Sequence, residues 1–507
     1  MKQSMPNKIV LYPLSFLFMF LAFSSVVNAK IVGLEGSSFQ FVATSGYITT
    51  PEGNSVYIWG YGKDAQNVQY PGPTLIVKQG QKVTITLYSA LAHPTSLLFP
   101  GQGEVTAQGG TRGKITQEAT PGHPVTYSFV ASKPGTYIYY SGSDPWFQIE
   151  MGLFGALIVR PSDYDPASPT AYGSPISSYD HEYLFLLSEM DAQIHKLAEE
   201  GRFNEIDNTN YFPVYWFING RSAPDTMAPN FADWLPHQPY NCMPRMTPGE
   251  KMLMRLIGAG RDLHPFHFHG NHARVIAKDG RLLNSHPGAN GDLSYFRFTI
   301  TTAPGGTTDA IFEWDGRELG WDFYGHSMSD PHEPNEFIHT WNIDSPLPAN
   351  VMEISVPAAI SKALPKYRAV RCIIWSKTHQ GPSTDQNREV VLLKRKKGTI
   401  FEIIRGREGT TAKSWNPGDF IAMTDHGKKF PVNLPEKQEI AFGGFYSGSP
   451  FLGHEGELPP GEGGLNPFGG FFFMWHSHNE KEMVNNNIFP GGMMTMMAVE
   501  PPGTNIE

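Results

Sequence analysis

Residues 80–87 read Gly-Gln-Lys-Val-Thr-Ile-Thr-Leu, and residues 249–256 read Gly-Glu-Lys-Met-Leu-Met-Arg-Leu. Each stretch begins with a glycine turn, and the first alternates apolar with polar side chains, as a strand with one buried face does. In each copy a Pro-Gly turn then leads to a further strand, at residues 121–122 and at residues 304–305. A weaker third copy lies near 434–436. This internal repeat predicts several similar β units in tandem.

The composition supports an all-β protein. The chain has 52 glycines and 42 prolines, whereas charged residues make up only 17% of it and aromatic residues 13%. Such a mixture is typical of short strands joined by turns. A length of 507 residues allows two or three domains. The net charge of −9 argues against nucleic acid as a partner.

The N-terminal residues predict export. An apolar run over 9–27 follows Lys2 and Lys8, and it ends at Val27-Asn28-Ala29, a small-x-small pattern that signal peptidases cut. We therefore expect residues 1–29 to be a signal peptide and the mature protein to be periplasmic or secreted, without a stable membrane span. The alternative is a single membrane anchor, against which the cleavage pattern argues.

Two cysteines, Cys242 and Cys372, are the only thiols in the chain. In an oxidising compartment they could form one disulfide, but they lie far apart in the sequence. Neither has the spacing of a metal ligand. We therefore interpret them as structural cysteines.

A histidine-rich motif occupies residues 264–270, His-Pro-Phe-His-Phe-His-Gly. On a strand successive side chains alternate between faces, so His267 and His269 project to the same side. Two adjacent imidazoles on a rigid strand can bind a transition metal, with copper, zinc and iron as suitable ions. Pro265 fixes the backbone after His264 and lets that residue face a different site.

Two segments resemble the multicopper oxidase superfamily: residues 70–77, Tyr-Pro-Gly-Pro-Thr-Leu-Ile-Val, and the motif at 264–270. The resemblance implies an all-β fold of tandem cupredoxin-like Greek-key β-sandwiches, three in number and with long loops. We place a first domain at 30–165, a second at 180–345 that carries the histidine motif, and a divergent third at 353–507. Within the third, residues 353–415 fit the repeat poorly and could be an insertion.

In that family the first histidine of the motif binds the mononuclear blue copper, and the other two serve a trinuclear cluster. A His-Cys-His tripeptide near the C-terminus completes both sites. Here the matching tripeptide is His476-Ser477-His478, and Glu482 stands where a further blue-copper histidine is expected. Serine lacks the thiolate that a blue-copper site needs. The resemblance thus implies a reduced metal site that holds one or two ions, copper first, with zinc or iron as alternatives. Its predicted ligands are His264, His267, His269, His476 and His478.

The first domain also departs from the family. Where two His-x-His pairs are expected, the sequence has Leu98 and Pro100, and then Tyr140 and Gly142. Of the eight histidines that serve the trinuclear cluster in the family, four remain. Four ligands can hold one metal well or two poorly, but not three in the usual arrangement.

The two histidine motifs lie roughly two hundred residues apart, farther than the family leads us to expect. Either they meet at one site or they serve separate sites, and His326 is an alternative neighbour for the 264–270 motif. The methionines of the C-terminal strand, Met493, Met494, Met496 and Met497, are expected to fill the core.

Three functions fit these observations. The first is an oxidoreductase of multicopper oxidase descent that acts on a small-molecule or metal-ion substrate, and not a conventional laccase. The second is a copper-binding or tolerance protein without turnover. The third is a metal-free scaffold of the cell envelope, with the histidines as remnants. Related chains assemble into oligomers, so a homo-oligomer is also an expectation.

Overall fold

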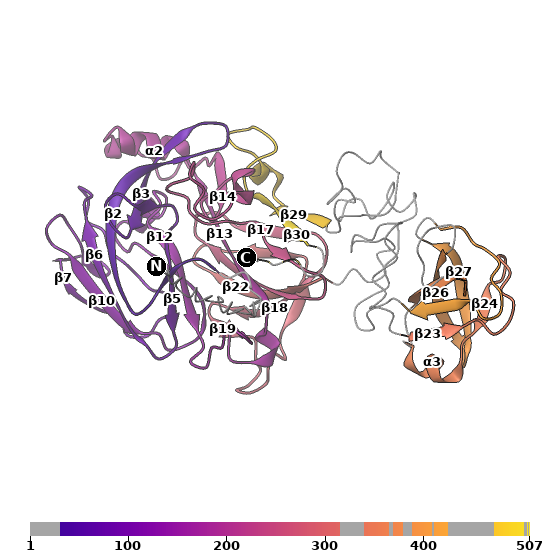
Figure 1. Ribbon diagram of the computed structural model, residues 1–507. Helices are drawn as coiled ribbons and strands as arrows, with labels where there is room; N and C mark the ends of the chain where they lie inside the picture. The colour runs from indigo at the N-terminus through magenta and orange to yellow at the C-terminus, as the bar shows by residue number, and fades with distance from the viewer. Residues whose placement is uncertain are drawn as a thin grey trace, which may run out of the picture.

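The computed structural model describes residues 31–314, 339–364, 369–378, 388–407, 410–423, 471–500, 504 and 506. Its secondary structure is dominated by strands, which form two β-sandwich domains and a third unit with a sheet of its own (Figure 1). The prediction of an all-β fold built from tandem sandwiches is confirmed. The proposed signal peptide lies outside the described residues. None of the helices in the described ranges is long and apolar enough to cross a membrane.

The first domain is a sandwich of a six-stranded and a four-stranded sheet, with strand orders β4-β3-β2-β6-β10-β7 and β1-β5-β12-β11, and β8 pairs with β9 in a separate two-stranded sheet. Its strands are β1 (Leu34–Glu35), β2 (Ser38–Thr49), β3 (Ser55–Gly62), β4 (Val68–Gln69), β5 (Gly72–Lys78), β6 (Lys82–Ser89), β7 (Thr106–Gly109), β8 (Thr111–Arg112), β9 (Gln117–Glu118), β10 (Val125–Val130), β11 (Gly135–Tyr140) and β12 (Phe154–Arg160). A short helix, α1 (Pro145–Gln148), precedes β12.

Strand β6 shows why these segments form a sandwich. Val83, Ile85 and Leu87 are fully buried, while the threonines between them lie on the other face. The inward-facing side chains of both sheets meet in one core, and such burial contributes roughly 25 cal/mol for each Å² of apolar surface. The predicted alternation at residues 80–87 is confirmed.

The second domain begins after a linker at the predicted boundary near 161–180. Its larger sheet has the order β14-β13-β16-β22-β18-β19, with β20 also paired to β18, and its smaller sheet has the order β15-β30-β29-β17-β21. The strands are β13 (His181–Met190), β14 (Tyr215–Ile218), β15 (Arg245–Met246), β16 (Lys251–Gly258), β17 (His264–Phe268), β18 (Ala273–Lys278), β19 (Arg281–Leu282), β20 (Tyr295–Arg297), β21 (Thr299–Thr302), β22 (Thr307–Glu313), β29 (Phe471–Ser477) and β30 (Met494–Val499). Helix α2 (Ala192–Glu199) follows β13, and 3-10 turns lie at η1 (Pro175–Ser177), η2 (Phe203–Glu205), η3 (Asp225–Met227) and η6 (Glu480–Met483).

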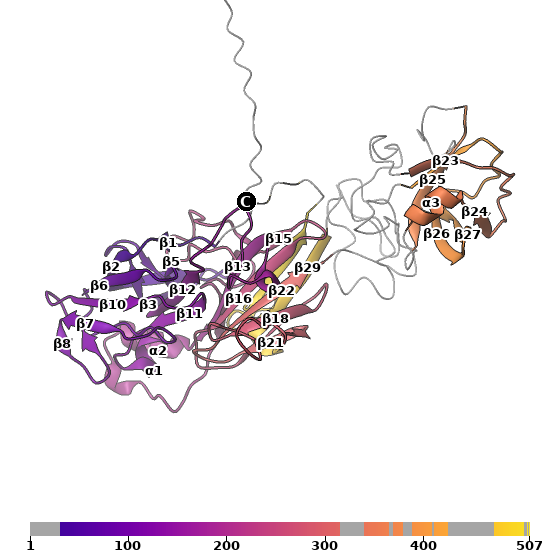
Figure 2. The same cartoon turned by 90° about the horizontal axis from the view of Figure 1, so that it is seen from below.

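The C-terminal strands β29 and β30 therefore belong to the second domain. Strand β29 pairs antiparallel with β17, and β30 pairs parallel with β15. Figure 2 shows the yellow C-terminal strands in the second domain, away from the orange third unit. The prediction that a third domain spans 353–507 and carries the His-Ser-His tripeptide needs correction. The chain leaves the second domain after β22 and returns to it at β29, because Phe473 and Trp475 complete its core.

Residues 339–423 form the third unit, a six-stranded sheet with the order β23-β28-β25-β26-β27-β24. Its elements are β23 (His339–Asn342), β24 (Glu353–Ser355), α3 (Ala358–Ala363), β25 (Val370–Trp375), β26 (Arg388–Lys397), β27 (Ile400–Arg407) and β28 (Phe420–Met423). The predicted boundary at 344–352 falls inside this unit, since β23 already pairs with β28. The expected insertion at 353–415 thus corresponds to most of a separate folded unit with its own core.

The two cysteines lie in different cores. Cys242 is buried in the second domain and Cys372 in the third unit, and no disulfide joins the two residues. The possible disulfide between them is therefore not formed, and the interpretation as structural cysteines agrees with their burial.

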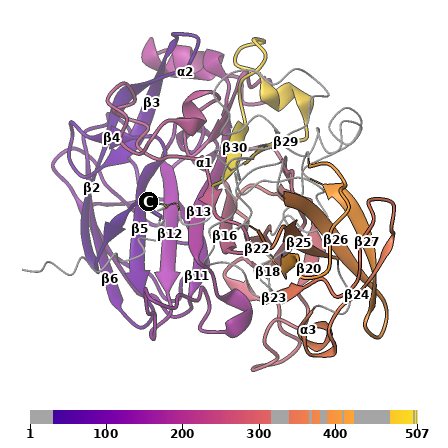
Figure 3. The same cartoon turned by 45° about the vertical axis from the view of Figure 1, so that its right-hand side comes forward.

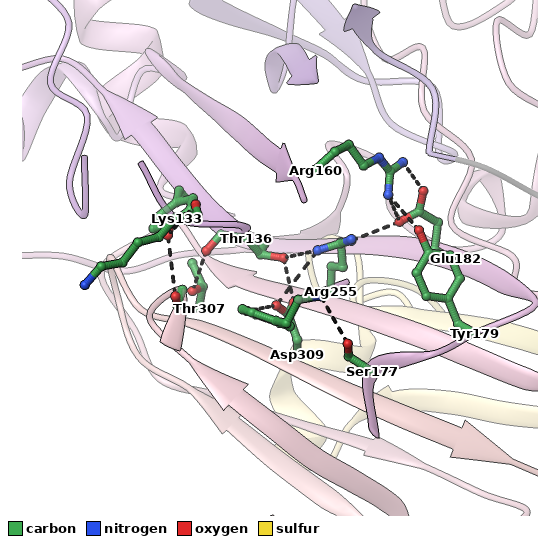
Figure 4. Close-up of polar contacts among 12 residues, drawn as sticks. Lys133, Thr136, Arg160, Ser177, Tyr179, Glu182, Arg255, Thr307 and Asp309 are labelled. Carbon is green, nitrogen blue, oxygen red and sulfur yellow. Dashed lines mark hydrogen bonds and ion pairs between the residues drawn. The ribbon is translucent and has the colours of Figure 1, made fainter. Parts of the chain in front are cut away.

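The first and second domains lie side by side and share an interface core (Figure 3). A buried ion network crosses this interface (Figure 4). Glu182 accepts hydrogen bonds from Arg160 at 2.7 Å and from Arg255 at 3.0 Å, and Thr136 of the first domain donates to Asp309 at 2.6 Å. Burial opposes the ionisation of Glu182, but the two guanidinium groups outweigh it and lower its pKa to about 2. The network therefore joins the two domains through buried side chains of opposite charge.

Candidate metal centre

The smaller sheet of the second domain separates two groups of candidate ligands. Along β17, His264, Phe266 and Phe268 are buried and face the interior of the sandwich, whereas His267 and His269 face outward. Strand β29 shows the same alternation and places Ser477 inside and His476 outside. The alternation of strand side chains therefore puts the predicted blue-copper positions and the predicted cluster positions on opposite faces of one sheet.

The outward-facing histidines form a cluster. His267 and His476 are direct cross-strand partners, and the ligand atoms of His267, His269 and His476 all lie within 4.8 Å of one another. The Nε2 atoms of His269 and His476 are 3.4 Å apart. The two motifs, separated by roughly two hundred residues, thus meet at one site.

Hydrogen bonds orient two of these imidazoles. His267 Nδ1 lies 2.7 Å from the Thr299 hydroxyl on β21, and His476 Nδ1 donates to the Ser477 carbonyl at 2.7 Å. With Nδ1 engaged, Nε2 of each ring is the nitrogen that can bind a metal, an arrangement that recurs around metal-bound histidines. Burial and the neighbouring imidazoles lower the pKa of His267 to about 4, and burial also lowers the pKa of His476. Both rings are therefore neutral at pH 7, as metal ligation requires.

His478 stands at the rim of the cluster. Its exposed ring lies 4.8 Å from that of His267 and 5.7 Å from that of His476, measured between ring centroids. On the other side of His267, the half-exposed Phe298 makes an edge contact at 5.8 Å. Three imidazoles with a fourth beside them and an accessible rim can hold one transition metal ion and leave room for a small ligand.

His264, predicted as a ligand, is not part of this cluster. It is fully buried, and its two nitrogens donate to two carboxylates, Nε2 to Glu189 at 2.8 Å and Nδ1 to Glu482 at 3.0 Å. Because both nitrogens donate, the ring is an imidazolium. Burial opposes this charge, but the two carboxylates outweigh it and raise the pKa of His264 to about 9. The structure thus places His264, which was predicted as a metal ligand, in an ion-paired triad with Glu189 and Glu482.

The triad is held by further hydrogen bonds. Glu189 also accepts from the backbone N–H of Asp262 at 2.9 Å and from the Tyr211 hydroxyl at 3.2 Å. Glu482 accepts from the Asn479 amide at 2.9 Å, and the Asn479 backbone N–H donates to Ser477 Oγ at 3.1 Å. The interior of the sandwich thus contains oxygen groups where a blue-copper site requires a thiolate and an unprotonated imidazole.

In the first domain, the positions that lack histidines lie next to one another. Leu98 and Tyr140 form a β-bridge, with the Leu98 N–H donating to the Tyr140 carbonyl at 2.7 Å. A Cβ on Gly142 would lie 2.8 Å from Leu98 Cγ. The two segments matched from the sequence are therefore neighbours, and the leucine side chain occupies the space beside the glycine.

Two further histidines of the described residues, His272 and His339, are not part of the cluster. His326 lies outside the described residues. His339 lies on β23 in the third unit, and His272 is exposed and contacts Phe298 at 5.2 Å. Sequence reasoning missed Glu189, although a glutamate within the apolar strand β13 is itself a signal, because a buried carboxylate requires a partner.

Comparisons with known proteins agree with these observations. Residues 45–164 match the sequence model of the family described as multicopper oxidase. The chain is 26% identical over 227 residues to a copper-containing nitrite reductase of Pseudomonas chlororaphis, which covers 43% of this chain and 57% of the relative. It is 23% identical over 295 residues to copper resistance protein A of Escherichia coli, covering 52% of this chain and 46% of the relative. The matched part thus spans about half the length of these relatives.

Among solved structures, a blue copper oxidase from Nitrosomonas europaea is similar with a TM-score of 0.46 and 15% identity, covering 92% of this chain and 86% of that one. The resemblance predicted from the motifs is confirmed. Residues 45–164 thus form a domain that matches the multicopper oxidase family, and longer stretches of the chain are similar to copper proteins.

Proposed function

We propose that this protein is an exported copper protein whose outward-facing imidazole cluster holds one copper ion. The observation that carries the proposal is the convergence of His267, His269 and His476 within 4.8 Å, with His478 beside them. The donor set fits copper, because imidazole is a good copper ligand and the hydrogen bonds of two of the rings leave Nε2 available. The apolar run and cleavage pattern at the N-terminus support export.

We infer an oxidoreductase role for this site, with a small oxidant as substrate. When bound, copper supplies a Lewis acid and a one-electron couple. The protein residues keep the imidazoles neutral and oriented, and Phe298 forms one accessible wall of the site. Oxygen is one candidate substrate, and nitrite is another because a copper-containing nitrite reductase is among the relatives.

Conventional laccase chemistry does not fit these residues. Such chemistry delivers electrons through a cysteine thiolate to a cluster of three coppers, whereas this chain has Ser477 at the thiolate position and Leu98 and Gly142 at first-domain ligand positions. Electrons must therefore reach the imidazole site from a donor that binds near it. A copper-binding or tolerance role without turnover is the second candidate, and copper resistance protein A among the relatives favours it.

The first test is the metal content of the full chain, purified from its own compartment. We compare the unaltered protein with His267→Ala/His269→Ala and with the control His272→Ala, which changes an exposed histidine outside the cluster. We expect about one equivalent of copper in the unaltered protein and in the control, and a loss of at least tenfold in the double variant. Electron paramagnetic resonance should report nitrogen ligands and no blue-copper signal.

Oxygen and nitrite consumption are then measured with an artificial electron donor. Turnover that is lost in the double variant but kept in His272→Ala supports the oxidoreductase, whereas bound copper without turnover supports the tolerance role. A native protein without metal, or equal copper in all three proteins, would overturn the proposal and favour the scaffold.

A further inference from the structure

The outer face of the smaller sheet continues beyond the histidines into methionines. In the strand register, Thr299 is opposite His267, His267 is opposite His476, and His476 is opposite Met494. This row crosses four adjacent strands, β21, β17, β29 and β30. Thioether and imidazole side chains therefore stand next to one another on one surface.

A second row runs beside the first. The His269 backbone N–H donates to the Met474 carbonyl at 3.3 Å, and Met474 is the cross-strand partner of Met496. Directly opposite residues in an antiparallel pair have Cβ atoms about 4.5–5.5 Å apart. Three methionines, Met474, Met494 and Met496, thus lie on adjoining positions of the same face, immediately beside the imidazole cluster.

These three methionines differ from the core methionines of the same strand. Met493 and Met497 are fully buried and belong to the second-domain core. Met494 and Met496 alternate with them, point to the opposite face and are partly exposed. The expectation that all four methionines fill the core is therefore correct for two of them and wrong for the other two. Partly exposed thioethers gain less from hydrophobic burial than core ones, so their grouping on this face calls for a further reason.

The geometry points to a separate cuprous-ion site formed by the thioethers of Met474, Met494 and Met496, at the edge of the imidazole cluster. Thioether sulfur is a soft ligand that selects Cu(I), whereas imidazole also suits Cu(II). Methionine side chains have three rotatable bonds, so three sulfurs on neighbouring strand positions can converge on one ion. The site binds the ion without a change of oxidation state. This inference rests on the proposed function in one respect, namely that copper is the metal that the protein binds.

The position of this site suggests what it does. Strand partners Met494 and His476 are in direct contact range, so a cuprous ion on the sulfurs lies one side chain away from the imidazole cluster. The three methionines therefore bind Cu(I) first, and the ion then passes to the neighbouring histidines.

The test uses the full chain under anaerobic conditions and Cu(I) supplied from a chromophoric Cu(I) chelator, with Ag(I) as a redox-silent probe. The test variant is Met474→Leu/Met494→Leu/Met496→Leu, and the matched control is Met493→Leu/Met497→Leu, which changes the same residue type on the core face. Methionine and leucine have similar volumes, so both variants should fold, and circular dichroism checks this. His267→Ala/His269→Ala is measured in parallel.

We expect the unaltered protein and the core-face control to bind one more equivalent of Cu(I) or Ag(I) than the test variant does. Copper X-ray absorption should show sulfur neighbours in the Cu(I) protein and none in the test variant. Equal Cu(I) binding by the test variant, or a shell of nitrogen and oxygen alone, would overturn this inference. The Cu(II) content of the histidine variant decides the proposed function separately, because that variant keeps all three thioethers.

Discussion

At the scale of single residues, His264 determines which chemistry the second domain can perform. Its imidazolium lies between Glu189 and Glu482 in a fully buried position, so a protonated ring supplies the positive charge among these carboxylates. Buried carboxylates need a counter-charge, and the proton provides it without a metal. Ser477 and Glu482 are thus mutually consistent replacements, because Glu482 pairs with the retained His264.

This triad predicts a pH-dependent stability. The pKa of His264 is raised from 6.5 to about 9. The contribution of its ion pairs to the free energy of unfolding is therefore complete below about pH 6.5 and is lost as the pH rises through about 9. We expect His264→Gln to destabilise the protein by about 3 kcal/mol at pH 6, because two carboxylates lose their partner, and by clearly less at pH 10. Urea unfolding followed by tryptophan fluorescence measures both values.

The control is His286→Gln, which changes an exposed histidine of the same domain and should have no effect at either pH. An equal loss of stability for His264→Gln at pH 6 and at pH 10 would show that the ring is not an imidazolium in the folded protein.

At the scale of elements, two segments of the first domain pack against each other at the positions where the family has histidines. Leu98 and Gly142 come from two segments that meet through the bridge between Leu98 and Tyr140. The glycine has no Cβ, and the leucine side chain takes that volume. Close packing of this kind keeps the density that protein interiors require.

A double-mutant cycle tests this complementarity. Gly142→Ala should destabilise the protein by about 1–3 kcal/mol, because its Cβ would lie 2.8 Å from Leu98 Cγ. In the Leu98→Ala background the same change should cost at least about 1 kcal/mol less, since the clashing atoms are gone. The control Gly103→Ala meets open space and should be neutral. Additive effects of the two substitutions in urea unfolding would contradict direct packing.

At the scale of the whole molecule, the interface between the first and second domains combines an apolar core with the buried network of Glu182, Arg255, Asp309 and Thr136. A buried network of opposite charges favours one relative orientation of the domains, because a displacement would separate the paired charges. The outer face with the imidazole cluster is therefore presented on a rigid two-domain body.

Replacing Arg255 tests this interlock. Arg255→Met keeps an unbranched stem but leaves Asp309 without a nearby guanidinium group, which should cost about 3 kcal/mol or more. We expect the cooperative calorimetric unfolding of the two domains to separate into two transitions. Arg202→Ala removes an exposed ion pair with Glu200 and Glu205 and should leave the transition unchanged. An unchanged single transition in Arg255→Met would contradict the proposed coupling.

The sequence by itself determined the strands and the identity of the candidate ligands. Alternation at 80–87 and at 264–269 follows from the local period of a strand, so burial and the shared face of His267 and His269 were predictable. The absence of a thiolate at Ser477 was equally readable. These properties depend on neighbours in the chain.

Only the tertiary structure decided which elements meet. The pairing of β29 with β17 joins residues roughly two hundred positions apart, and no local pattern encodes that choice. This pairing places the His-Ser-His tripeptide in the second domain, whereas the sequence predicts it in a third. It also places His476 opposite His267, and the pairing of β29 with β30 places Met494 opposite His476. It also gave His264 its two carboxylates from β13 and from η6. Long-range pairing is selected by the combined burial of whole sheets, so the site emerges only when the sandwich is complete.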